Sequence, residues 1–138
     1  MNTVAKPNNL KRNIWAVRIL TTLVILAFGP SAILKLMHAP VVVQGFTHAS
    51  IPEAAILPLG LIELFCLAVY LIPQTVVLGT LLLTGYLGGA IVTNIVNRTD
   101  FIHALVVGLF VWAGAWFRVA ELQTLIPTRK AQRNVGQP

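Results

Sequence analysis

The chain has 138 residues, of which 57% are hydrophobic and only 10% are charged, and its mean hydropathy is +0.81. Soluble domains carry about 25% charged residues, so this composition cannot supply an ordinary water-solvated surface. The single cysteine, Cys66, excludes an intramolecular disulfide, a CxxC redox pair and a cysteine-based zinc site, because each of these needs at least two thiols. The composition therefore predicts one domain embedded in a lipid bilayer.

The net charge of +6 is carried mostly by two short basic tails, residues 1–13 and 122–138. A nucleic-acid-binding surface needs basic residues that are interleaved with aromatic or polar contacts, and tails that flank apolar segments do not provide this pattern. We therefore exclude nucleic acid as a partner. Basic residues beside apolar segments are instead typical of the signals that orient a membrane protein.

A membrane-spanning helix needs about 20 mostly apolar residues. Taken in chain order, four such segments are predicted, at residues 14–36, 52–72, 75–96 and 101–119. Residues 40–50 are too short to span a membrane and are predicted to form an interfacial or re-entrant segment. The predicted fold is therefore all-α, a four-helix transmembrane bundle within a membrane domain of residues 14–121.

The distribution of basic residues predicts the orientation of this bundle. Four spans place both termini on the same side, which then holds eight of the ten Lys and Arg residues and leaves Lys35 and Arg98 for the other side. Both termini are therefore predicted to be cytoplasmic, in a multi-pass protein of the cell membrane. The first segment also resembles a secretory signal, but the membrane character of the chain after it favours an uncleaved anchor.

Glu63 is the one charged residue in the middle of a predicted span. Charged side chains at the centre of a membrane helix cost about 2.5 to 3.5 kcal/mol, so they usually face the bundle interior. Helical spacing places Glu63 on one stripe with Gly60, Cys66 and Tyr70. This stripe is predicted to pack against partners and not to face lipid. Lys35, at the end of the first span, can either reach water or bend inward toward this carboxylate.

A group of polar residues shares the depth of Lys35 in the predicted bundle. Thr93 and Asn94 come late in the third span, and His103 comes early in the fourth. We predict a ligand-binding site with Glu63 as the buried acid, Lys35 as its charge partner and the other three residues as a polar rim. The alternative is that Glu63 only joins helices through a hydrogen bond or an ion pair.

Other motifs indicate packing more than chemistry. Gly85, Gly88 and Gly89 give the third span a small-residue surface where another backbone can approach closely. The GYLGG run lacks the strand, the lysine and the helix N-terminus of a phosphate-binding loop. His38 and His48 have no acidic or cysteine partner at ligand spacing, so no metal site is predicted.

Three motifs occur along the chain in a characteristic order. They are the run from Arg18 through Gly29-Pro30-Ser31 to Lys35, the PLGLIEL segment, and LTGYLGGAIVTNI. Together they resemble the DoxX-like family of small four-helix membrane proteins, over roughly residues 14–119. The wider relatives of that family include a membrane subunit of a thiosulfate:quinone oxidoreductase, and others are linked to redox maturation or to the assembly of membrane proteins.

The function predicted from these observations is the binding of a hydrophobic, carbonyl-bearing molecule, such as a quinone, between the helices, in support of a membrane redox system. Electron transfer would need a redox partner protein, because the sequence offers no covalently bound cofactor, so the chain would be at most an accessory subunit of a quinone-linked oxidoreductase. The alternative is a non-catalytic scaffold or assembly partner in which Glu63 and Lys35 only orient helices. Transport is the weaker class, since no inverted repeat is visible.

Overall fold

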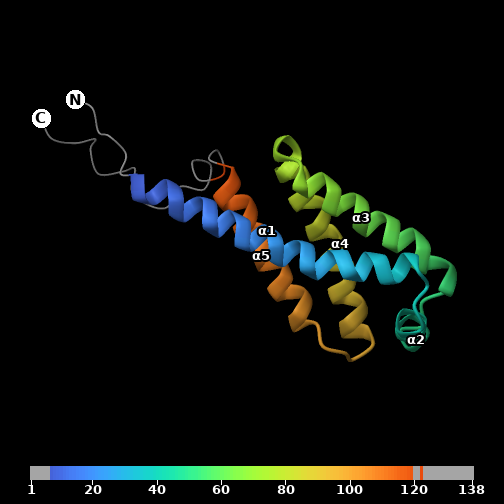
Figure 1. The fold of residues 1–138 in the computed structure, drawn as a ribbon. Helices are drawn as coiled ribbons and strands as arrows, with labels where there is room; N and C mark the ends of the chain where they lie inside the picture. Colours follow the sequence, from blue (N-terminus) through green and yellow to red (C-terminus); the bar gives the residue numbers. More distant parts are fainter. Residues whose placement is uncertain (1–6, 120–121, 123–138) are drawn as a thin grey trace, which may run out of the picture.

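The computed structural model describes residues 7–119 and residue 122, and in this part the chain forms five α-helices (Figure 1). Their bounds are Pro7–Leu36 for α1, Pro40–His48 for α2, Ile56–Leu71 for α3, Val76–Val96 for α4 and Ile102–Arg118 for α5. Short 3-10 helices at Glu53–Ala55 and Pro73–Thr75 precede α3 and α4. The prediction of an all-α bundle is confirmed.

Three helical stretches are long and apolar enough to cross a membrane: Ile14–Leu36, Glu53–Leu71 and Pro73–Val96. The fourth predicted span corresponds to α5, an apolar helix of 17 residues. At 1.5 Å per residue, 17 residues reach about 25 Å, close to the thickness of the hydrocarbon core. The chain is thus a multi-pass membrane protein with three to four membrane-length helices. The predicted interfacial segment is the nine-residue helix α2.

The four long helices form a ring in which α1 and α4 each pack against both α3 and α5. Figure 1 shows that α5 ends near the turn that joins α3 to α4. The guanidinium of Arg118, the last residue of α5, donates a hydrogen bond of 3.0 Å to the carbonyl of Tyr70 near the end of α3. The other end of the bundle carries the end of α1, the helix α2 and the turn between α4 and α5.

Apolar side chains fill the centre of this ring and also cover its outside. Val24, Leu83 and Val111 are completely buried, whereas Leu26 and Leu109 are 62% and 70% exposed. Large exposed apolar surfaces are unusual in water-soluble monomers and mark contact with a membrane or a partner. The outer surface is therefore the one that hydrocarbon tails would cover.

Glycines allow the helices to meet closely around Tyr70. A Cβ atom at Gly79 of α4 would collide with the backbone of Tyr70, and one at Gly114 of α5 would collide with the Tyr70 hydroxyl. That hydroxyl donates a hydrogen bond of 3.3 Å to the carbonyl of Val111. A side chain at either glycine would push helices apart, so both positions keep this end of the bundle compact.

Close approach is not found at Gly85, Gly88 and Gly89 of α4, where the sequence predicts a packing surface. A Cβ atom at any of the three would meet no atom within 4 Å among the residues that the structure describes. The glycines that bring helices together here are instead Gly60, Gly79 and Gly114. The α4 surface around Gly85 and Gly89 is left open.

Candidate functional site

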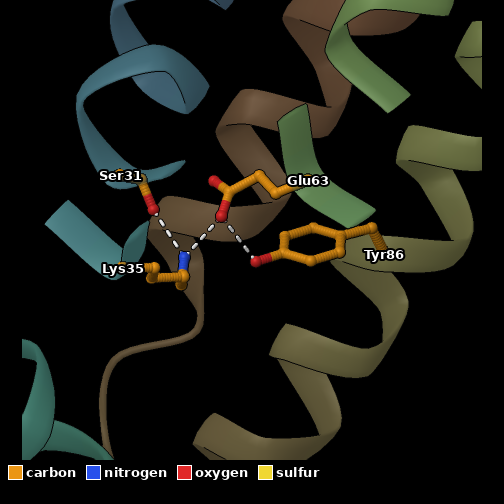
Figure 2. A network of polar contacts seen from close by, with 4 residues as sticks. All are labelled: Ser31, Lys35, Glu63 and Tyr86. Carbon is orange, nitrogen blue, oxygen red and sulfur yellow. Dashed lines mark hydrogen bonds and ion pairs between the residues drawn. The ribbon is translucent and has the colours of Figure 1, made fainter. Parts of the chain in front are cut away.

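Glu63 lies inside the bundle, on α3, with only 1% of its surface exposed. Its Oε2 atom is 2.5 Å from the Nζ atom of Lys35, which comes from the last turn of α1 (Figure 2). The predicted stripe is confirmed, since Gly60, Cys66 and Tyr70 are buried on the same helix. Lys35 bends inward to the carboxylate, with 13% of its side chain exposed, so it is the charge partner of Glu63.

Two further side chains complete this polar cluster, which consists of Ser31, Lys35, Glu63 and Tyr86 (Figure 2). The hydroxyl of Tyr86, on α4, donates a hydrogen bond of 2.8 Å to Oε2 of Glu63. The Lys35 ammonium donates one of 2.7 Å to the hydroxyl of Ser31, one turn earlier on α1. Additional hydrogen bonds of this kind are what a buried ion pair needs to offset the loss of hydration.

The sequence did not single out Ser31 or Tyr86 as site residues. Ser31 precedes Lys35 by four residues, and this spacing puts the two side chains on one helix face. Tyr86 lies within the family-like motif on α4, but its neighbours there are apolar or glycine, and they do not reveal which side faces inward. The spacing could have identified Ser31, whereas Tyr86 becomes evident only from the fold.

Aromatic contacts fix the position of Tyr86 across the bundle from α1. Its ring meets the ring of Phe28 edge-to-face, with 6.3 Å between centroids. The ammonium of Lys35 lies 5.8 Å from the centroid of the Tyr86 ring, within the range of a cation–π interaction. Tyr86 therefore contacts both members of the ion pair and an apolar neighbour on α1.

Gly60 allows α1 and α3 to approach each other beside the ion pair. A Cβ atom at this position would stand 2.9 Å from Cβ of Lys35 and 3.5 Å from the carbonyl oxygen of Ala32. Gly60 is one turn before Glu63 on α3, so any side chain there would displace the backbone that carries Lys35. The short ion pair thus depends on a glycine that makes no polar contact itself.

The cluster keeps unused hydrogen-bonding capacity. A lysine ammonium has three N–H donors, and in the described part of the chain two of them are directed to Ser31 and Glu63. The hydrogen bonds from Lys35 and Tyr86 both end on Oε2 of Glu63. One donor on Lys35 and the second carboxylate oxygen, Oε1, are therefore available to a further molecule.

A hollow of about 290 Å³ lies beside the ion pair, between α1, α3, α4 and α5. Four of the five predicted site residues line it: Lys35, Glu63, Asn94 and His103. Two neighbouring hollows of about 470 Å³ each are also lined by Lys35 and Asn94, and both of these include Thr93. The structure therefore brings all five predicted residues to one set of adjoining hollows.

Two of the predicted rim residues have partners away from the ion pair. Thr93 donates a hydrogen bond of 2.9 Å to the carbonyl of Gly89 in its own helix. The amide of Asn94 donates one of 3.2 Å to the carbonyl of Asp100, which ties the turn between α4 and α5. His103 has an exposed side chain in the first turn of α5. The three residues surround the hollows without belonging to the polar cluster.

Comparison with known proteins supports the family resemblance. Residues 19–117, well over half of the chain, match the model of the DoxX-like family. No curated protein and no solved structure shows a significant match to the chain. The resemblance inferred from the three motifs is confirmed.

The ion pair should contribute to the free energy of unfolding. Lys35→Met leaves the Glu63 carboxylate buried without its charge partner, and such a change costs about 3 kcal/mol. Adding Glu63→Gln removes the stranded charge, so we expect the double variant to be more stable than the sum of the two single variants predicts, by about 1 to 3 kcal/mol. Unfolding of the purified protein by SDS in mixed micelles would measure this coupling.

The control is Glu53→Gln, which makes the same chemical change on an exposed residue in the 3-10 helix before α3. It should have no coupling with Lys35→Met. If the effects of Lys35→Met and Glu63→Gln were simply additive, the ion pair would not join α1 to α3.

Proposed function

Because this chain belongs to the DoxX-like family of membrane proteins, we propose that it binds a hydrophobic, carbonyl-bearing molecule, such as a quinone, between its helices. The binding position is the hollow beside Lys35 and Glu63, and the bound molecule serves a membrane redox system. The observation that carries this proposal is the Lys35 N–H donor that no described residue accepts, at the edge of a hollow with a mixed polar and apolar lining.

A carbonyl oxygen is the chemical partner that this donor fits. It accepts a hydrogen bond and carries no formal charge, so a molecule that presents it can contact the apolar part of the lining as well as the ammonium. Half of the residues that line the hollow are apolar, among them Leu87, Ala104 and Val107. Ligand sites commonly combine an apolar lining with a few polar groups in volumes of roughly 300 to 1,000 Å³.

Glu63 and Tyr86 hold the donor in place for such a ligand. The carboxylate fixes the Lys35 ammonium at 2.5 Å, and the Tyr86 hydroxyl fixes the carboxylate at 2.8 Å. A group that is already oriented loses little conformational entropy when the ligand binds. Thr93, Asn94 and His103 would contact polar substituents of the ligand at the rim of the hollows.

The redox role requires a second protein. Electron transfer would take place on a partner that carries a redox centre, and this chain would act as an accessory subunit that presents or receives the quinone. The competing function is a scaffold. It is favoured by the ion pair and the hydrogen bonds through which Lys35, Glu63 and Tyr86 join α1, α3 and α4.

A binding experiment separates these two functions. Decylubiquinone titrated into the detergent-purified protein should quench tryptophan fluorescence saturably, and Lys35→Met should abolish this binding. Tyr86→Phe should weaken it by about fivefold, because the carboxylate that orients the donor loses a hydrogen bond from a neutral donor, worth about 1 kcal/mol.

The matched control is Tyr70→Phe, the same change at the only other tyrosine, whose hydroxyl bonds to Val111 near the opposite end of the bundle. This variant should bind decylubiquinone as the parent does. Absence of saturable binding to the folded parent, or equal binding by all of these variants, would favour the scaffold.

We also propose that the bundle end where α1 begins and α5 ends faces the cytoplasm, because the sequence up to Arg18 and from Arg118 onward contains eight of the ten Lys and Arg residues. In a Cys66→Ser background, a membrane-impermeant maleimide should label Thr99→Cys, in the turn between α4 and α5, on intact cells. Asn8→Cys should be labelled only after lysis. The reverse labelling would overturn this orientation.

A further inference from the structure

We propose that the hollow between α2, α3 and α4 binds the hydrocarbon tail of the molecule whose polar head lies at Lys35, and that Gly85 and Gly89 form its floor. This inference rests on the proposed function and specifies the ligand class further. The ligand is then an amphiphile with a carbonyl-bearing head and a long apolar chain, and the chain leaves the protein over α4.

The hollow has the right lining and neighbourhood for a tail. Its volume is about 470 Å³, and apolar side chains from three parts of the chain face it: Phe46 of α2, Ile51 after α2 and Leu59 of α3. Lys35 and Tyr86 line both this hollow and the one beside Glu63. One molecule can therefore keep its head at the ammonium while its chain occupies the second hollow.

The two glycines leave space in this hollow on the α4 side, because neither has a side chain. Gly85 and Gly89 are four residues apart and lie on one face of the helix. Both are exposed, and a Cβ atom at either would meet nothing within 4 Å among the described residues. Further along this helix, Val92 and Val96 are 61% and 73% exposed, which places them on the surface that lipid would cover. A tail lying over the glycines therefore passes directly into the bilayer.

Packing within the chain does not explain these glycines. A glycine weakens a helix relative to alanine. At Gly60, Gly79 and Gly114 this loss of stability is offset, because the missing side chain allows a neighbouring helix to pack closely. Gly85 and Gly89 admit no neighbour in the described chain. Space for a ligand beside Tyr86 would explain why both positions are glycine.

The size of the hollow indicates a flexible chain and not a protein segment. An α-helix with its side chains is about 10 Å across, so a helix from a second copy would lie across the mouth of this hollow of about 470 Å³, whereas a single hydrocarbon chain can enter it. A hydrocarbon chain is narrow and can follow the path from Lys35 past Ala90 to Gly85. The bilayer that surrounds α4 is also where the rest of such a chain would be soluble.

The experiment compares two probes that share a head group. Decylubiquinone carries a saturated decyl chain, and dimethoxymethylbenzoquinone is the same ring without that chain. Each is titrated into the detergent-purified parent, Gly85→Leu, Gly89→Leu and the control Gly88→Leu. Gly88 does not line this hollow, although a Cβ there also meets nothing within 4 Å among the described residues.

We expect Gly89→Leu and Gly85→Leu each to weaken decylubiquinone binding by about tenfold, because a leucine side chain takes the volume of several methylene groups of the tail. Binding of the ring without a tail should stay within about twofold of the parent, and Gly88→Leu should leave both affinities unchanged. Each affinity is expressed relative to the parent with the same probe, which removes the effect of partition into micelles.

The other outcomes overturn one proposal or both. If the parent binds neither probe, the proposed function fails and this inference fails with it. If the parent binds both probes and the leucine variants weaken both equally, or weaken neither, the head site stands and the tail lies elsewhere. Two leucine positions keep the test decisive when one of the variants does not fold.

Discussion

The bundle is organised around an ion pair held in apolar surroundings, between Lys35 and Glu63. Two charges taken out of water repay the loss of hydration only when the geometry is close and the remaining atoms find partners. Ser31 and Tyr86 supply those partners. The pair consequently fixes how α1, α3 and α4 face one another, and it directs one ammonium donor toward the neighbouring hollow.

The two ends of the bundle are packed differently, and this difference creates the site. Around Tyr70, Gly79 and Gly114 let α4 and α5 approach so closely that a Cβ atom at either position would collide with Tyr70. At the end that carries Lys35, the helices surround adjoining hollows, and α2 lies beside two of them. Gly60 holds α1 against α3 there, so the ion pair stays short while the space beside it stays open.

Hydropathy predicted the spans well because a membrane sets their length. Residues 75–96 differ by one residue from α4, whereas α1 begins at Pro7, ahead of the predicted residue 14, since apolarity marks the immersed part of a helix and not its whole extent. The inward position of Glu63 followed from the cost of a charge in hydrocarbon. Tyr86 could not be found this way, because a helix that is apolar on every side does not reveal which side is buried.

The most direct test of the ion pair is the charge of Glu63 itself. An infrared difference spectrum between the parent and Glu63→Gln isolates this one carboxyl group among the four acidic residues of the chain. We expect the variant to lose the stretching bands of an ionised carboxylate. Loss of a protonated carboxyl band in their place would show that Glu63 is neutral and would contradict the ion pair on which the fold and the site depend.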